Sequence, residues 1–226
     1  MTMSEPNPHY DAAYWAKQHV RGEFGGTANL IKFTPYIRAT DRVADFGAGG
    51  GYLLQKLRCA EKIGVEINPK ALADARGRGL RMVESLDAIE DGSIDVFISD
   101  NALEHVDAPF DVLRKVHRKL KDEGRAVFVV PCEGLARRFK PDDPDMHLFS
   151  WSPMCLGNLF TRAGFSVVEC TPFVHKWPPS YATLQGIVGW PLFHLICRIW
   201  ARLERSWFQV RCVARKQPAA GSGEER

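Results

Sequence analysis

The sequence predicts an α/β fold built on an open, doubly wound and mostly parallel sheet. Two observations predict this fold. Short apolar runs, each as long as a buried strand, alternate with segments in which apolar residues have helical spacing. The strand-like run VADF (43–46) leads directly into the glycine-rich turn GAGGG (47–51), which is typical of sheets that bind a ligand at their carboxyl edge. Because the sequence contains no repeat and no linker, we expect a single domain over residues 1–216.

Each predicted strand is an apolar run bounded by turn residues. The predicted strands are residues 42–46, 62–67, 80–84, 93–100, 125–131, 165–173 and 207–216. The segment SIDVFISD (93–100) is apolar on both faces, which is expected of a central strand in a parallel sheet.

The predicted helices lie between these strands, at residues 10–39, 50–58, 69–76, 108–121 and 153–163. In the first of them, the glycines of GEFGG (22–26) predict a break, and Thr27 is a candidate N-cap for the second part. Pro69 occupies an early helical position that favours proline. The segment 176–206 is a helical insertion between the last two strands, and the polar tail 217–226 is predicted to be disordered.

The composition is that of an ordinary globular protein, with 226 residues of which 45% are hydrophobic. A net charge of +3 is too small to indicate a nucleic acid partner. The six cysteines include no C-x-x-C pair, so we expect reduced thiols in the cytoplasm and no metal site. The polar start of the chain does not resemble a signal peptide, and polar residues interrupt the apolar stretch 184–200.

The glycine-rich turn separates two classes of nucleotide ligand. A dinucleotide site requires G-x-G-x-x-G, and Tyr52 occupies the position of the third glycine. The sequence instead reads D-x-G-x-G-x-G over residues 45–51, and a second acid, Glu66, closes the next strand. A carboxylate at that place accepts hydrogen bonds from both ribose hydroxyls. These features favour a nucleoside that carries an amino acid over a dinucleotide.

Four stretches together resemble class I S-adenosylmethionine-dependent methyltransferases of the small-molecule, type 11/23-like branch. VADFGAGGG resembles the first motif of that family, and GVEINP resembles its acid after strand two. DGSIDVFISDNALEHV and VLRKVHRKLKDEGRAVFVVP resemble two later motifs, with KDEG (121–124) where KPGG is usual. The resemblance covers about residues 40–175. It implies S-adenosyl-L-methionine as cofactor and a Rossmann-like seven-stranded sheet in the order 3-2-1-4-5-7-6, with strand 7 antiparallel.

The resemblance also implies a set of cofactor-binding residues, namely Asp45, Gly47, Ala48, Gly49, Glu66, Ile67, Ser85, Leu86, Asp87, Asp100 and Asn101. The glycines would let the turn pass under the methionine moiety, whose amine Asp45 would orient. Glu66 would hold the ribose, and Ile67 would pack on the adenine. The Leu86 backbone would read the adenine edge.

Two assignments in this set need further definition. Either Ser85 or Asp87 would meet the adenine amino group. Asp100 and Asn101, at the end of the fourth strand, would face the methionine part and the reacting methyl group.

The acceptor is less well defined than the cofactor. Many amine N-methyltransferases carry [DN]-P-P-[YF] after strand four, whereas this sequence reads DNAL (100–103), which favours O- or C-methylation of a small molecule or saccharide. His147 and His105 are the candidate bases. Each has a structural alternative, since His105 also suits packing or helix capping and His147 suits capping of the next helix. A non-catalytic cofactor-binding scaffold or regulator is the alternative function.

The two ends of the chain suggest further contacts. Tyr14, Trp15 and Arg21 belong to an N-terminal segment (1–39) that would cover the cofactor as a lid. The stretch 190–206 combines an apolar stripe with arginines, a pattern shared by core or subunit contacts, acceptor pockets and peripheral membrane contacts. Either a monomer or a homodimer is compatible with the sequence.

Overall fold

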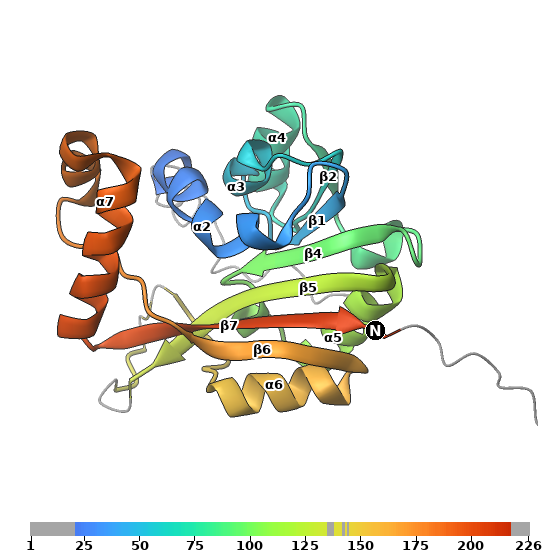
Figure 1. Ribbon diagram of the computed structural model, residues 1–226. Coiled ribbons are helices and arrows are strands. Elements are labelled where there is room, and N and C mark those ends of the chain that lie inside the picture. Colours follow the sequence, from blue (N-terminus) through green and yellow to red (C-terminus); the bar gives the residue numbers. More distant parts are fainter. Residues whose placement is uncertain (1–20, 135–137, 142, 144, 218–226) are drawn as a thin grey trace, which may run out of the picture.

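The computed structural model describes residues 21–134, 138–141, 143 and 145–217 (Figure 1). The predictions for Tyr14, Trp15 and the helix before residue 21 lie outside the described residues. So does the prediction for the tail beyond residue 217.

One seven-stranded sheet organises the described chain, in the order β3-β2-β1-β4-β5-β7-β6. The strands are β1 (Arg42–Phe46), β2 (Glu61–Val65), β3 (Arg81–Val83), β4 (Ile94–Asp100), β5 (Leu120–Glu133), β6 (Phe165–Phe173) and β7 (Trp207–Lys216). Strands β1 to β5 pair in parallel, and β7 pairs antiparallel with both β5 and β6. The predicted strand order and the antiparallel seventh strand are therefore confirmed.

Helices cover both faces of the sheet (Figure 1). The α-helices are α2 (Leu30–Phe33), α3 (Tyr52–Lys56), α4 (Pro69–Gly77), α5 (Pro109–Lys119), α6 (Pro153–Arg162) and α7 (Tyr181–Leu203), and the short 3-10 helices are η1 (Thr34–Tyr36), η2 (Leu86–Ala88) and η3 (Leu103–His105). Leu54 of α3 packs with Val43 and Ile98 on one face. Leu113 of α5 and Phe160 of α6 pack with Phe128 in the core on the other face.

The glycines of the segment 22–26 lie inside a helix, so the predicted break at this place is wrong. Residues 21–28 are helical, and the interruption falls at Asn29, just before α2. A Cβ atom on Gly22 would lie 2.3 Å from the Tyr52 ring, and one on Gly26 would lie 2.5 Å from the Tyr52 carbonyl oxygen. These glycines permit close packing of the helix on α3, a role that sequence reasoning confuses with helix breaking.

Strand β5 begins at Leu120, earlier than the predicted residue 125. Ile94 pairs with Leu120 and Val96 pairs with Arg125, so residues 121–124 form an irregularity between these two pairings. Glu123 adopts a left-handed φ of 62° there. The turn KDEG is therefore absorbed into the start of β5, which the sequence pattern alone does not show.

The two outer strands of the sheet are irregular or short. Strand β3 has only three residues. The pairing of β6 with β7 shifts register between Val167 and Glu169, which leaves Val168 out of the ladder and 59% exposed. Between β6 and β7 the chain forms α7, which Gly189 kinks with φ 71° and ψ 170° two residues before Pro191.

Candidate functional site

The glycine-rich turn lies at the carboxyl end of β1 and requires residues without side chains. Gly47, Gly49 and Gly51 have left-handed φ angles of 76°, 52° and 75°. A Cβ atom on Gly47 would lie 2.3 Å from that of Ala102, whereas one on Gly49 would meet nothing within 4 Å. The turn is therefore packed against the protein at Gly47 and open at Gly49, where a ligand can approach the backbone.

Glu66 organises the same turn from the end of β2. Its carboxylate accepts hydrogen bonds from the backbone N–H groups of Gly49, Ile67 and Asn68, each at 2.8 Å. An ionised carboxylate has about four lone-pair sites, so at least one remains for a ligand hydroxyl. Glu66 thus joins the glycine turn to the start of α4, where Asn68 caps the helix by accepting from Lys70 and Ala71.

Asp45 is the buried acid of the site. It is 3% exposed at the end of β1. Burial raises its pKa well above the usual value, and the negative charges of Asp100 and Glu66 raise it further. Such a carboxylate gains from a cationic partner, because a positive ligand group would relieve both the desolvation and the repulsion.

A buried lysine, which the sequence analysis did not identify, pairs with Asp100. Lys32 of α2 is 4% exposed, and its Nζ lies 2.8 Å and 3.0 Å from the two carboxylate oxygens of Asp100. Asn101 donates to Asp100 at 3.2 Å and accepts from Gln209 of β7 at 2.8 Å. The signal in the sequence was a single lysine within the apolar run NLIKF.

Two histidines and two acids meet beside these groups, at the ends of β4 and β5. Glu104 and His105 lie in η3, and the Glu104 carbonyl accepts from Leu148 at 2.9 Å, which holds His147 against η3. The rings of His105 and His147 are 5.0 Å apart, and His147 Nδ1 lies 3.0 Å from Glu133 Oε1.

Glu104 lies behind the two histidines and is fully buried. Its Oε1 lies 3.9 Å from His105 Nε2 and 4.0 Å from His147 Nε2. Neither of its carboxylate oxygens has a hydrogen-bond partner among the described residues. Burial raises the pKa of Glu104 to about 8. The sequence does not indicate Glu104 as a site residue, because the burial of a glutamate cannot be read from the run LEHV.

Asp45, Glu66, Lys32, Asp100 and the two histidines line one cleft of about 670 Å³, whereas the buried Glu104 does not reach it. The predicted site residues along it are Asp45, Gly47, Ala48, Gly49, Glu66, Ile67, Asp100, Asn101, His105 and His147, and Arg21 lies there as well. Lining residues that the sequence did not indicate include Lys32, His175, Lys176, Trp177 and Gln209. The structure thus brings both predicted histidines to the cleft that the glycine turn opens into.

The predicted adenine contacts do not line this cleft. Ser85 accepts from the backbone N–H of Asp87 at 3.1 Å and so caps η2. Leu86 is buried in the core at 2% exposure, and Asp87 accepts from Lys115 at 2.6 Å. Their side chains serve the fold in this structure, although the turn that carries them follows β3 at the same edge of the sheet.

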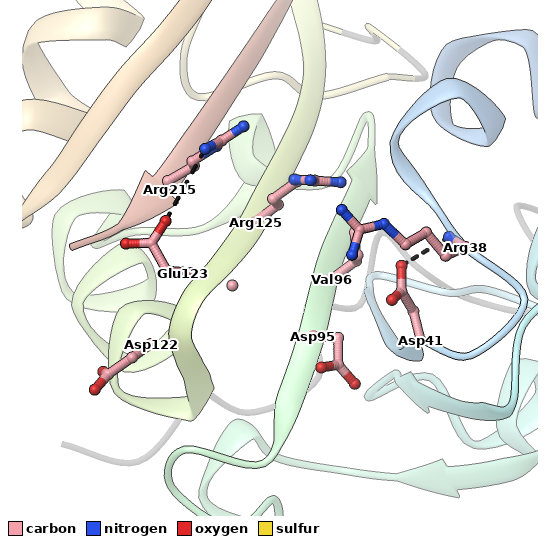
Figure 2. Close-up of a pocket in the computed structure, with 9 residues that line it drawn as sticks. Arg38, Asp41, Asp95, Val96, Asp122, Glu123, Arg125 and Arg215 are labelled. Carbon is pink, nitrogen blue, oxygen red and sulfur yellow. Dashed lines mark hydrogen bonds and ion pairs between the residues drawn. The ribbon is translucent and has the colours of Figure 1, made fainter. Parts of the chain in front are cut away.

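A second cavity, of about 350 Å³, lies at the opposite ends of the strands (Figure 2). Figure 2 shows three arginines along one side of it and four acids along the other, with Arg215 beside Glu123 and Arg38 beside Asp41. Asp95 accepts from Lys121 Nζ at 2.8 Å and from the Arg42 backbone at 2.9 Å. Burial acts to raise the pKa of Asp95, but these hydrogen bonds outweigh it and the pKa is lowered.

Comparison with known proteins gives a family match for part of the chain that forms the first cleft. Residues 44–128, which carry the glycine turn, Glu66 and the end of β4, match the family model described as a methyltransferase domain. This match indicates a methyltransferase domain over that part of the chain. Several solved structures that share the fold are S-adenosylmethionine-dependent methyltransferases. No curated protein sequence matched the chain.

Solved structures share the fold of this methyltransferase at low sequence identity. An S-adenosylmethionine-dependent methyltransferase from Archaeoglobus fulgidus is 23% identical, with 91% of this chain and 100% of that chain covered and a TM-score of 0.65. A chain solved in complex with the Haloferax volcanii Trm112 methyltransferase activator is 19% identical, with 93% and 96% covered and a TM-score of 0.67. Phosphoethanolamine N-methyltransferase 2 of Haemonchus contortus is 13% identical, with 94% and 58% covered and a TM-score of 0.65.

Proposed function

We propose that this methyltransferase transfers a methyl group to an oxygen of a small-molecule or saccharide acceptor. The observation that carries the proposal is the position of His147, which lies on the cleft of the glycine turn with its Nδ1 on Glu133 at 3.0 Å. A carboxylate that accepts from Nδ1–H orients the imidazole and leaves Nε2 as a proton acceptor. Hydroxyl acceptors need such a base, whereas a neutral amine already has a nucleophilic lone pair.

Described residues offer partners for the methionine and ribose parts of the cofactor, and one apolar contact for its adenine. Gly49, with open space where a Cβ would lie, would pass under the methionine moiety. Asp45, a buried acid whose charge is disfavoured in the free protein, would accept from the methionine amine. Glu66 would use its remaining acceptor capacity for the ribose, and Ile67, 38% exposed, would pack on the adenine. Bound S-adenosylmethionine supplies a methyl group that its sulfonium already activates.

The residues of the chain would then position the acceptor and exclude water. We place the acceptor between the histidines and the chain of polar groups formed by Lys32, Asp100 and Asn101, because these line the same cleft. An attacking oxygen must lie at a near-attack distance of about 3–3.5 Å from the methyl carbon. His147 would accept the hydroxyl proton, and His105, whose ring is 5.0 Å away, is the second candidate.

Turnover by the full chain tests this function. We expect S-adenosylmethionine to bind, NADH not to bind, and S-adenosylhomocysteine to form with hydroxylated small molecules or sugars. His147→Gln should lower kcat by about 10²-fold or more, the contribution of a general base, while cofactor affinity stays unchanged. Cofactor binding without turnover on any acceptor would favour the scaffold or regulator alternative. Products methylated at carbon or nitrogen would overturn the oxygen assignment.

We further propose that residues 1–216 form one domain. In this proposal the N-terminal segment and the insertion close the acceptor pocket. Arg21 and Trp177 both line the cleft, one from the N-terminal segment (1–39) and one from the insertion (176–206). Phe24 contacts Trp177 at a ring separation of 5.0 Å and Phe193 of α7 at 5.6 Å. This aromatic contact joins the proposed lid to the insertion.

The outer side of α7 carries an exposed apolar row that includes Leu192, Leu195 and Ile199, with Arg198 and Arg202 nearby in sequence. No helix in the described part of the chain is long and apolar enough to cross a membrane. We propose that this row makes a peripheral membrane contact through residues 190–206, in a cytoplasmic protein whose six cysteines are all free thiols. Flotation with anionic vesicles should carry the wild-type chain and not Leu195→Asp. Equal flotation of both proteins would exclude this contact.

A further inference from the structure

Glu104, His105 and His147 form a cluster of three potential metal ligands. A general-base role for one histidine does not explain why the buried Glu104 lies beside both histidines. The three donor atoms all lie within 4.8 Å of one another. Glu104 is the unusual member, because it is fully buried and neither carboxylate oxygen has a hydrogen-bond partner among the described residues. A buried polar atom without a partner is costly, so its position indicates a partner that the described residues do not supply.

The donor set defines the kind of partner. Two imidazoles and one carboxylate are the ligands of His₂Glu zinc sites and of the two-histidine, one-carboxylate iron sites. Both Nε2 atoms face the same carboxylate oxygen, at 3.9 Å and 4.0 Å. Donors around a four-coordinate ion lie about 3.4 Å apart, for bonds of about 2.1 Å, so only a small closure is needed.

The surroundings of His147 also suit a histidine that binds a metal ion. Its Nε2 faces Glu104, and its other nitrogen, Nδ1, lies 3.0 Å from Glu133 Oε1. A carboxylate on the far nitrogen of a histidine fixes the tautomer and strengthens the other nitrogen as a donor, which is the usual outer contact of a metal-bound histidine. The side chains of His105 and His147 are 17% and 16% exposed, so the open side of the cluster faces the cleft.

We propose that Glu104 Oε1, His105 Nε2 and His147 Nε2 bind one divalent transition-metal cation, with free positions on the cleft side for a hydroxyl of the acceptor. The sequence predicts no metal site, because its cysteines lack the spacing of metal ligands. This inference rests on the proposed O-methylation and changes the role of His147 from base to ligand. The cation would polarise the hydroxyl, which loses its proton to water. The oxygen then forms the bond to the methyl carbon, and the electron pair of the broken C–S bond remains on sulfur.

Direct cation binding tests the proposal without any need for an acceptor. The untagged full-length chain is stripped with EDTA, dialysed and titrated with Co²⁺, followed by calorimetry and by the visible spectrum of the ion. We expect one equivalent per chain. Glu104→Gln and His147→Gln should each weaken binding by more than 10-fold. Glu133→Gln should weaken it by about 10- to 100-fold through the loss of the outer contact.

His117→Gln is the matched control, because it removes a half-buried histidine that packs on Phe165, away from the cluster. It should bind Co²⁺ as the wild type does. S-adenosylmethionine binding is measured on every variant and shows that each one folds. Absence of a stoichiometric site in the wild type would overturn the cation proposal, as would equal binding by Glu104→Gln. Cofactor binding that persists in either case leaves the proposed methyltransferase function intact, and its loss in the wild type would overturn that function alone.

Discussion

The two ends of the sheet differ in how some of their acids are paired. At the amino ends of the strands, the acids around the second cavity are paired, as Asp95 is with Lys121 and with the Arg42 backbone (Figure 2). At the carboxyl ends, Asp45 lies beside two other acids, and Glu104 has no hydrogen-bond partner among the described residues. The pKa of Asp95 is lowered, whereas the pKa values of Asp45 and Glu104 are raised.

This difference distinguishes acids that stabilise the free protein from acids that gain a favourable partner when a ligand binds. A paired acid contributes to stability in the free protein. A buried acid without a cation lowers the stability of the free protein and recovers that free energy when a cationic group binds. The state of pairing is therefore an informative property of each cavity. Substitutions at the two ends should accordingly have opposite effects.

The largest effect on cofactor affinity is expected at Glu66. Glu66→Ala removes both the ribose acceptor and the carboxylate that holds the backbone N–H groups of Gly49, Ile67 and Asn68. We expect S-adenosylmethionine binding to weaken by about 1–3 kcal/mol, which is the scale of hydrogen bonds to a charged group. Isothermal titration calorimetry measures the change.

Glu61→Ala is the control for this variant. Glu61 lies at the start of β2, where its carboxylate contacts Arg42 and Arg81 on the surface. We expect its loss to leave cofactor affinity unchanged. Equal affinities for Glu66→Ala and wild type would remove Glu66 from the cofactor site.

The next effect is expected at Asp45, where a substitution should change protein stability and cofactor affinity in opposite directions. Asp45→Asn keeps the shape of the side chain and removes a buried charge that burial, Asp100 and Glu66 all disfavour. The free protein should unfold at a higher temperature than the wild type, while cofactor affinity falls by about 10-fold or more because the amine loses a charged partner. Asp95→Asn should do the reverse, with a melting temperature lower by about 2–4 °C for each kcal/mol lost and cofactor affinity unchanged.

The pH dependence of these two variants sharpens the comparison. The folded-state pKa of Asp45 is raised, so the wild type loses stability as pH rises from the unfolded value toward the folded one. The advantage of Asp45→Asn should be near zero at about pH 4 and grow toward neutral pH. The folded-state pKa of Asp95 is lowered, so its contribution is present at neutral pH and disappears as pH falls through that value. Thermal unfolding across pH checks both, and parallel curves for the two variants would contradict the distinction.

Most of the fold could be predicted because its information is local. Strands β1, β4, β6 and β7 are apolar runs of ordinary length, and their order follows from the resemblance to the methyltransferase family. The predictions of secondary structure were wrong where contacts with residues distant in sequence determine the local conformation. Gly22 and Gly26 lie in a helix, where the absence of a side chain lets Tyr52 pack closely against them.

The candidate site divides along the same line. The glycine turn and Glu66 directly follow predicted strands, so the local sequence pattern is enough to recognise them. Lys32 could not be assigned, because it meets Asp100 across 68 positions of the chain. Glu104 could not be assigned either, because its significance lies in its complete burial and in a histidine from a distant loop. Such meetings depend on tertiary packing, which no local pattern specifies.

The irregular outer strands of the sheet bear on how copies of this protein meet one another. One border is the three-residue β3, and the other is β6, which carries the displaced Val168 and has Pro172 in its ladder. Proline lacks an N–H group, and a displaced residue bends the strand, so neither border offers the straight row of donors and acceptors that a foreign strand requires. Fibre-like growth by edge addition is thereby disfavoured, and association between copies is left to helices and side chains.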